Sequence, residues 1–271
     1  MSGDMIWRND RVLYNGLVFR LEHYKSDDWE LGDECFMFYK VKDLVDDYER
    51  FFASRQLECR RFLELGMWEG GSLVFWYELF RPDKIVGIDL RKWVETSYFQ
   101  HYIAQNGLRD RVKSYWQVNQ ADTQRVRGIV SAEFDEPLDL VVDDASHLYE
   151  PTLISFQTLF PLIRPGGFYI IEDWAWEHWP ACFTSELAAF GERGLTDLVS
   201  EIVQAAGTSN GLIKSITVYQ GFAAIERGDS PPPTDFNLRN EIVRFQRPVR
   251  RPRVVERLKR AIHRGSRSRH A

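Results

Sequence analysis

The stretch RFLELGMWEGGS, residues 61–72, decides the fold that this sequence predicts. Its first five residues are typical of a short buried strand, and a glycine-bearing turn at 66–71 leads into a helix at 72–80 with Ser72 as its cap. Strands follow at 84–89, 112–118, 138–143 and 167–171, and helices near 95–106, 151–162 and 184–205. This alternation predicts an α/β fold with a doubly wound, mostly parallel sheet. Runs at 212–219 and 221–226 predict a closing antiparallel hairpin, which brings the sheet to seven strands.

The pattern divides the chain into three parts. Residues 57–230 form the predicted α/β domain. Residues 1–56 are predicted to be a helical and irregular extension, whose amphipathic helix at 38–54 covers an edge of the sheet or roofs the site. Residues 231–271 are Pro-rich and then basic, which predicts a partly disordered tail.

Length and composition are those of a globular protein. The 271 residues are 44% hydrophobic, enough to supply the core of one enlarged α/β domain. No run approaches the roughly 18 apolar residues that span a bilayer, and the first residues lack a signal-peptide pattern, so we expect a cytoplasmic protein. Cys35, Cys59 and Cys182 are far apart without CxxC spacing, which favours buried thiols over disulfides or a zinc site.

The net charge of −5 hides an asymmetry. Residues 241–271 contain eleven Lys and Arg against two Glu, a balance of +9, so residues 1–240 carry −14. The basic tail could contact nucleic acid, an anionic membrane or an acidic partner, but it lacks a recognised binding motif, and a solvated tail is the simpler interpretation. Homo-oligomerisation stays open.

Two acidic clusters close neighbouring strands of the predicted sheet. Asp143-Asp144-Ala145-Ser146-His147 ends the strand at 138–143, and Glu172-Asp173 ends the strand at 167–171. Ligands of open α/β sheets collect beyond the carboxyl ends of the strands, so we expect these side chains to share one crevice. Carboxylates packed together raise one another's pKa, and a hard divalent cation such as magnesium would relieve this. A neighbouring histidine could then remove a proton.

The turn after the first strand predicts a nucleoside-type ligand. Gly66, Gly70 and Ser72 form this turn, and Asp89 ends the next strand, where a carboxylate can accept hydrogen bonds from ribose hydroxyls. Trp68 stands where the dinucleotide motif GxGxxG has its second glycine, and the acidic Glu64 would repel a pyrophosphate. A nucleoside with little negative charge therefore fits better than a dinucleotide.

These motifs resemble the class I S-adenosylmethionine-dependent methyltransferases. The resemblance rests on E-L-G-x-x-x-G-G-S, Val-Gly-Ile-Asp-Leu, the Pro-Gly-Gly lead into the fifth strand and the closing hairpin, over about residues 60–227. It implies a Rossmann-like sheet and S-adenosylmethionine as cofactor. The implied cofactor-binding residues are Glu64, Gly66, Gly70, Ser72 and Asp89, with Gln120 and Asp122 near the adenine, and Asp143 as a cofactor contact or a carboxylate behind the metal ligands.

The acidic clusters narrow the resemblance to the magnesium-dependent sugar O-methyltransferases of the mycinamicin and rhamnosyl type and the related cephalosporin-hydroxylase-like group. This resemblance implies Asp144, Glu172 and Asp173 as magnesium ligands and His147 as the general base. It also implies methyl transfer to a hydroxyl of a sugar or glycosylated natural product, the small-molecule acceptor.

The aromatic segment after the second acidic cluster has two interpretations. Trp174, Trp176 and His178 are suited to stacking on an acceptor, but they could equally pack the loop onto the body. Two alternative functions also stay open. One is a catechol-type metal-dependent O-methyltransferase, and the other is a non-catalytic cofactor-binding protein that interacts through its basic tail.

Overall fold

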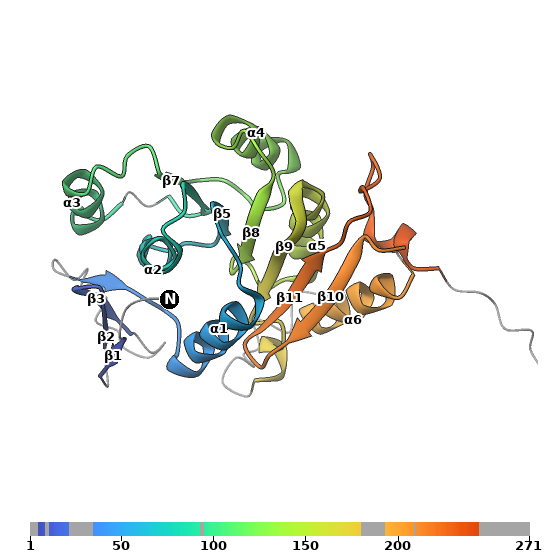
Figure 1. Ribbon diagram of the computed structural model, residues 1–271, viewed down its shortest axis with the longest axis horizontal. Helices are drawn as coiled ribbons and strands as arrows, with labels where there is room; N and C mark the ends of the chain where they lie inside the picture. Colours follow the sequence, from blue (N-terminus) through green and yellow to red (C-terminus); the bar gives the residue numbers. More distant parts are fainter. Residues whose placement is uncertain are drawn as a thin grey trace, which may run out of the picture.

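The computed structural model describes residues 5–8, 11–21, 35–92, 95–179, 193–208 and 210–243. A seven-stranded sheet forms the centre of the fold (Figure 1). Its strands are β5 (Arg61–Leu65), β6 (Lys84–Ile88), β7 (Val112–Tyr115), β8 (Leu138–Asp143), β9 (Ile163–Glu172), β10 (Ile213–Val218) and β11 (Phe222–Arg227), in the order β10-β11-β9-β8-β5-β6-β7. The strands from β5 to β9 pair in parallel, whereas β11 runs antiparallel to both its neighbours. The predicted Rossmann-like sheet with its closing hairpin is confirmed.

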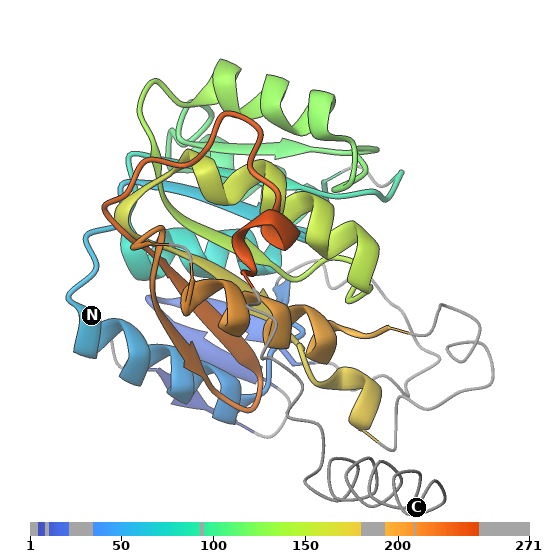
Figure 2. The ribbon, with the colours of Figure 1, turned by 90° about the vertical axis from the view of Figure 1, so that its right-hand side faces the viewer.

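Among the described residues, three α-helices cover each face of this sheet. One face carries α1 (Lys42–Arg55), α2 (Gly71–Phe80) and α3 (Ser97–Gln105). The other carries α4 (Thr123–Glu133), α5 (Tyr149–Leu159) and α6 (Leu195–Ala206), which lie side by side in Figure 2. Successive residues of β8 join opposite cores, with Leu140 and Val142 on the first face and Val141 on the second. This alternation follows from the two-residue period of a strand that is covered on both faces.

The N-terminal part contains a small sheet that the expectation of a helical and irregular extension missed. Its strands are β1 (Ile6–Trp7), β2 (Arg11–Tyr14), β3 (Leu17–Arg20) and β4 (Phe36–Met37), in sequential order. Asn15 and Gly16, both with positive φ, make the two-residue turn between β2 and β3. Asn-Gly between two apolar runs is the strongest short hairpin signal, so the sequence did contain this information.

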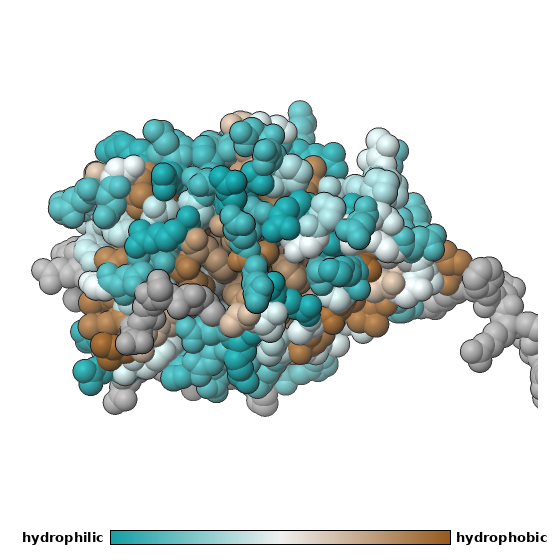
Figure 3. Space-filling view, viewed as in Figure 1, coloured by the Kyte–Doolittle hydropathy of each residue, from teal (hydrophilic) through white to brown (hydrophobic). Residues whose placement is uncertain are grey.

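The small sheet packs against the first helical face of the domain. The Phe19 ring of β3 lies 5.7 Å from the Phe75 ring of α2, edge to face. Hydrophilic side chains cover most of the view in Figure 3, and hydrophobic ones are seen at its lower left, over this sheet, and near its centre. In the small sheet, Ile6 of β1 is 50% exposed.

Helix α1 covers the antiparallel side of the central sheet. Its Tyr48 ring stacks at 4.2 Å on Phe222 of β11, and its Phe51 ring lies 5.1 Å from Phe168 of β9. The helix begins at Lys42, later than the predicted residue 38, because residues 38–41 are extended and lead from β4 toward the acidic clusters. Helix α1 therefore covers the sheet as expected, and the residues before it, 38–41, reach the site.

Several predicted elements differ in detail. Helix α4 was not predicted, although Val126, Ile129 and Val130 have helical spacing and are buried. Helix α2 is capped by Gly70 in the left-handed conformation, so Ser72 lies inside the helix and the prediction of a serine cap was wrong. Short 3-10 helices lie at Phe160–Leu162, Trp176–His178 and Leu238–Glu241.

Some predictions fall on residues outside the described part. These are the start of the helix predicted at 184–205, Cys182 and the basic tail from residue 244. Of the described cysteines, Cys59 is buried and Cys35 is partly buried. Within the described residues, no helix combines the length and the apolar character that crossing a membrane requires.

Candidate active site

Loops that follow β5 and β8 touch at the carboxyl end of the sheet. The N–H of Asp144 donates to the carbonyl of Leu65, the last residue of β5, at 2.9 Å. Gly66 follows with a φ of +82°, and a Cβ there would lie 2.1 Å from the carbonyl oxygen of Asp144. Glycine is required at this position because the backbone of the acidic loop occupies the side-chain space. The glycine turn is therefore fitted to the acidic loop.

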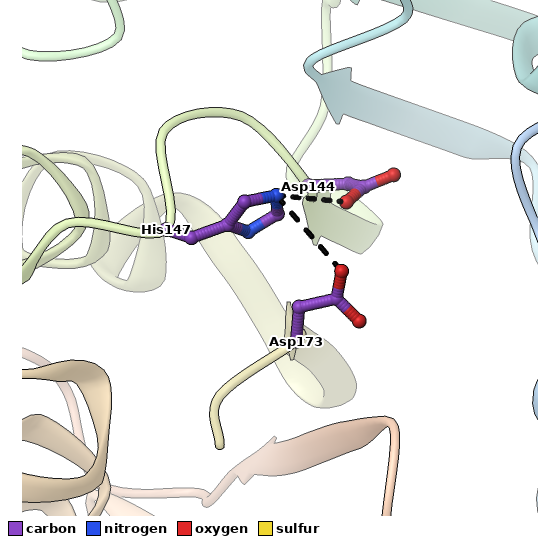
Figure 4. Close-up of side chains that lie close together, drawn as sticks. All are labelled: Asp144, His147 and Asp173. Carbon is purple, nitrogen blue, oxygen red and sulfur yellow. Dashed lines mark ion pairs between the residues drawn. The ribbon is translucent and has the colours of Figure 1, made fainter. Parts of the chain in front are cut away.

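Asp144, His147 and Asp173 come together as the strand-end prediction requires (Figure 4). The His147 Nε2 atom lies 3.8 Å from Oδ1 of Asp144 and 4.0 Å from Oδ2 of Asp173. One potential ligand atom from each residue lies within 4.8 Å of the others. All three side chains are partly exposed, so a ligand can reach them. Two loops thus present two carboxylates and one imidazole to a common point.

Left-handed backbone holds three residues of these loops. The φ angles are +51° at Trp68, +52° at His147 and +51° at Asp173, after β5, β8 and β9 respectively. A residue with a Cβ adopts this conformation at a cost of roughly 1–3 kcal/mol, which the surrounding structure must offset. Such residues cluster at functional sites, and here they turn the chain sharply at the ends of three strands.

A lysine that the sequence analysis did not single out enters the acidic cluster. The buried Lys40 Nζ donates to Oδ2 of Asp144 at 2.9 Å and to the two carboxylate oxygens of Glu172 at 2.8 and 2.7 Å. The Tyr48 hydroxyl donates to Oε1 of the same glutamate at 2.9 Å. Glu172 therefore faces protein donors, whereas Asp144, His147 and Asp173 face one another. Its predicted role as a metal ligand stays a prediction.

The electrostatics of this cluster show an excess of negative charge. Burial, followed by the charge of Asp144, raises the pKa of Glu172 and of Asp173 above the ordinary carboxyl range. Burial also raises the pKa of Glu64 to about 8, so this residue is mostly neutral near pH 7. Burial disfavours the charge on Lys40, but Asp144 and Glu172 outweigh it and raise the lysine pKa. When all three carboxylates are ionised, the one ammonium group of Lys40 compensates one of them and two negative charges remain.

Asp143 belongs to a different network from Asp144. Its buried carboxylate accepts hydrogen bonds from Tyr169 and Ser155, each at 2.6 Å, and from Gln120 at 3.1 Å. Consecutive strand residues point to opposite faces, so Asp143 faces α5 while Asp144 faces the crevice. The side-chain oxygen Oε1 of Gln120 accepts a hydrogen bond from the N–H of Ser146 at 3.0 Å. Asp143 and Gln120 therefore support the loop that carries His147, and their predicted cofactor contacts stay predictions.

Two of the three other acids predicted for the cofactor, Asp89 and Asp122, are held by backbone donors. Asp89 accepts from the N–H groups of Trp68 and Arg91, each at 2.8 Å. A carboxylate has about four acceptor sites, so each oxygen of Asp89 keeps capacity for a ribose hydroxyl. Asp122 caps α4 by accepting from the N–H of Arg125 at 3.0 Å, which accounts for it without a ligand.

The remaining residues of the predicted cofactor turn have identifiable protein contacts. The buried Glu64 accepts from the indole of Trp76 at 3.0 Å. A Cβ on Gly70, whose φ is +86°, would lie 2.8 Å from the Phe99 ring of α3. The partly exposed Ser72 lies in the first turn of α2 and counteracts the raised pKa of Glu64 through a hydrogen bond. Whether these residues also contact a cofactor stays a prediction.

The aromatic segment after β9 is tied to the body. The Trp174 indole donates to the Tyr219 carbonyl at 2.8 Å, and the Trp176 indole donates to the His147 carbonyl at 2.6 Å. Both tryptophans pack against the second core. His178, more exposed, lies 3.0 Å from the Thr196 hydroxyl. These contacts support packing of the loop, and acceptor binding by it stays a prediction.

The sequence reasoning missed Lys40 and the hydroxyl of Tyr48. Tyr48 was recognised only as an apolar position of the amphipathic helix. Lys40 ends the apolar run Phe36-Met37-Phe38-Tyr39, and a single cation that closes an apolar segment was the available signal. Its partners lie 104 and 132 residues away, so no local pattern links them.

Comparison with known proteins agrees with the geometry. Residues 63–174 match a family described as a methyltransferase domain. The match and the strand order together make this part of the chain a class I methyltransferase domain. The match begins after Lys40 and ends just past Asp173, so it contains both acidic clusters but not the lysine between them.

Within that class the chain is similar to sugar O-methyltransferases. It is 30% identical over 212 residues to demethylmacrocin O-methyltransferase of Streptomyces fradiae, covering 67% of this chain and 47% of the relative. It is 31% identical over 176 residues to mycinamicin VI 2''-O-methyltransferase of Micromonospora griseorubida, covering 62% and 37%. The solved structure of the methyltransferase MycE with Mg, SAH and mycinamycin VI superposes with a TM-score of 0.52 at 27% identity, covering 73% of this chain and 53% of that one. The matched part spans about half the length of these proteins or less.

Proposed function

We propose that this protein is an S-adenosylmethionine-dependent, magnesium-dependent O-methyltransferase that acts on a hydroxyl of a sugar or glycosylated natural product. The observation that carries the proposal is the convergence of Asp144, His147 and Asp173 at the carboxyl ends of β8 and β9, beside the glycine turn of a methyltransferase domain. The similar proteins are named as O-methyltransferases of demethylmacrocin and of a rhamnosyl tetracenomycin C, and the second name supports a glycosylated acceptor.

The first half of the site is assigned to the cofactor. Asp89 is oriented by two backbone N–H groups and has acceptor capacity left for the ribose hydroxyls. Gly66, Gly70 and Ser72 would lie along the methionine moiety, as the family resemblance implies. When bound, S-adenosylmethionine supplies a methyl group on a good leaving group, so alignment is the main task left to the protein.

The second half has the donor chemistry of a magnesium site. Asp144 and Asp173 offer carboxylate oxygens, which magnesium prefers to an imidazole nitrogen, and the two uncompensated negative charges match one divalent cation. These two aspartates would hold the ion together with Glu172, as the family resemblance implies, and His147 stays free to act as a base. When bound, the ion lowers the pKa of the acceptor hydroxyl and orients its oxygen.

His147 would take the proton that the acceptor hydroxyl loses. Methyl transfer breaks the carbon–sulfur bond and forms a carbon–oxygen bond at the acceptor, and the hydroxyl proton passes to Nε2 of His147. The imidazolium that results lies within 4.0 Å of Asp144 and Asp173, and their negative charges stabilise it. The Trp176 hydrogen bond to the His147 carbonyl holds the loop of the base against the loop after β9.

The acceptor would lie over the segment after β9. The rings of Trp174 and Trp176 can stack on it while their indole nitrogens stay bonded to the protein, and His178 would lie at its outer edge. A cytoplasmic location, homo-oligomer formation and contact of the basic tail with an anionic surface are further parts of this proposal. They rest on the sequence alone.

Methyl transfer from labelled S-adenosylmethionine tests the proposal. The purified protein is incubated with macrolide glycosides and rhamnosides, with catechols as the comparison, in the presence of magnesium, of EDTA, and of EDTA with excess magnesium. We expect transfer to at least one glycoside, its loss with EDTA and its recovery with magnesium. Exclusive transfer to catechols would favour the alternative enzyme, and transfer that ignores EDTA would remove the metal from the proposal.

A further inference from the structure

The apolar stripe of α1 continues past the end of the central sheet. Near the middle of β9, Phe168 lies 5.1 Å, ring to ring, from Phe51 of the helix. One turn earlier in the helix, the Tyr48 hydroxyl reaches Glu172, the last residue of β9, at 2.9 Å. The helix therefore runs antiparallel to β9, and its N-terminus lies beyond the carboxyl end of that strand.

Val41 is the N-terminal member of this stripe. Residues three and four apart share a face of a helix, so Val41 lies in line with Leu44, Val45 and Tyr48. These other members are buried, whereas Val41 is 57% exposed. At a rise of 1.5 Å per residue, Val41 lies about 10 Å farther along the helix axis than Tyr48. The stripe thus becomes exposed where the helix passes the end of β9.

The turn between β10 and β11 connects this end of α1 to the loop after β9. Leu44 packs closely against Gly221, where a Cβ would lie 2.6 Å from Cδ1 of the leucine. The Gly221 carbonyl accepts a hydrogen bond from the N–H of Asp173 at 2.8 Å. In the same turn, the Tyr219 carbonyl accepts from the Trp174 indole at 2.8 Å. The N-terminal end of α1 and the tryptophan segment therefore adjoin one turn at the edge of the acidic cluster.

Val41 is also an unusual residue for its position in the helix. It is the N-cap of α1, with extended backbone angles, and its side chain makes no capping hydrogen bond. Serine, threonine, aspartate and asparagine are preferred at this position because their oxygens accept from free N–H groups of the first turn. Val41 directly follows Lys40, whose Nζ lies 2.9 Å from Asp144. Residues that break such local preferences are expected at functional sites, and this one lies beside the acidic cluster.

We propose that Val41 is a specificity-determining residue of the acceptor site, where its methyl groups contact an apolar surface of the acceptor beside the hydroxyl that is methylated. This inference rests on the proposed function above. A sugar ring presents C–H groups next to each hydroxyl, and covering them with a valine removes apolar area from water. The contact is the same before and during methyl transfer, so it strengthens acceptor binding and leaves the chemical step unchanged.

Val41→Ser separates this role from a structural one. Serine gives the helix a capping oxygen and removes the apolar contact, so the variant should withstand more urea while binding the acceptor less well. We expect the acceptor KM to rise by roughly three- to tenfold, from the loss of one partly exposed valine, and kcat to change by less than about twofold. The acceptor is the macrolide glycoside or rhamnoside that the wild type methylates fastest. Calorimetric titration of that acceptor, with S-adenosylhomocysteine and magnesium present, should show the same loss of affinity.

Two further variants complete the test. Val203→Ser makes the same change at a valine of α6 that is 52% exposed, on the opposite face of the sheet. Its acceptor KM should stay within about twofold of wild type. Val41→Ile keeps an apolar side chain at the site, so its acceptor KM should rise by less than threefold.

The outcomes separate this inference from the proposed function. If the wild type methylates no glycoside, the proposed function fails and the inference fails with it. If the wild type methylates a glycoside but Val41→Ser raises KM by less than threefold, only the inference is overturned. Lower resistance to urea together with weaker binding would indicate a structural role and overturn it as well. A change of oligomeric state with an unchanged KM would place Val41 between two copies of the chain, against the inference.

Discussion

Acidic residues have opposite surroundings in the two halves of the site. One half consists of the loops after β5 and β6, and the other consists of the loops after β8 and β9. In the first pair, Asp89 is surrounded by backbone N–H groups, and it keeps its place without a ligand. In the second pair, Asp144 and Asp173 face each other and an imidazole, with a single lysine as partial compensation. One half of the crevice is therefore complete as protein, whereas the other has the acidic residues that we propose for a cation. A substitution of the same kind should have different effects in the two halves.

The largest effect is expected for Asp144→Asn. This change removes charge from the proposed metal site, and losing the metal's several kcal/mol of transition-state stabilisation corresponds to a roughly thousandfold fall in kcat/KM. Labelled methyl transfer measures the rate, and calorimetry should show weaker magnesium binding. Asp110→Asn, at a fully exposed surface position, is the control and should keep full activity. Normal activity of the Asp144→Asn variant would show that this half of the site does not depend on the charge of Asp144, and the proposed difference between the two halves would be wrong.

His147→Gln should lower kcat by roughly 10²–10⁴-fold, the range for loss of a general base. Magnesium affinity should stay near that of wild type, because the imidazole is proposed to accept the proton and not to bind the ion. Calorimetry and initial rates check the two quantities separately. His101→Gln, on an exposed position of α3, should change neither. A large loss of magnesium affinity in His147→Gln would make the histidine a ligand.

Asp89→Asn tests the cofactor half with the same chemical change as Asp144→Asn. Hydrogen bonds to a charged group contribute roughly 1.5–3 kcal/mol, so binding of S-adenosylhomocysteine should weaken by roughly 10- to 100-fold. Magnesium affinity should not change, and methyl transfer should still be lost when EDTA is added. The measurement is calorimetric titration with the cofactor product. If cofactor binding is unaffected while magnesium binding is lost, the two halves have been assigned the wrong way round.

The smallest effect on catalysis is expected for Tyr169→Phe, which changes the support beneath the site. The variant removes one of the hydrogen bonds to the buried Asp143, at 2.6 Å, and a hydrogen bond to a charged group contributes roughly 1.5–3 kcal/mol to the free energy of unfolding. Urea denaturation measures this loss, and kcat should fall less than tenfold. Tyr115→Phe is the comparison, because that hydroxyl pairs with Glu133 in a partly exposed place and should matter less. A catalytic loss as large as that of His147→Gln would assign Asp143 to the chemistry.

The parts of the site that were predictable are those set by strand ends. β5 and β8 have the predicted limits, and the acidic clusters follow from where apolar runs stop. Asp143 and Asp144 point in different directions because successive residues of a strand face opposite sides. The sequence does not say which of two adjacent acids faces which side, so this could not be predicted. The position of Lys40 depends on how the N-terminal segment folds over the domain. Helix α4 and the Asn15-Gly16 turn are another matter, because their spacing and turn residues were present in the sequence.

Lys40 also has a consequence for how the molecule is made. The lysine precedes its partner Glu172 by 132 residues, and at synthesis rates of about 5–20 residues per second the two are separated by several seconds. During most of that interval Lys40 lacks both of its carboxylate partners, because Asp144 follows it by 104 residues and Glu172 by 132. We expect the nascent chain to leave this segment open to proteases until β9 emerges from the ribosome, and to close it when Glu172 arrives. The acidic centre and the segment that carries Lys40 would then come together late in synthesis.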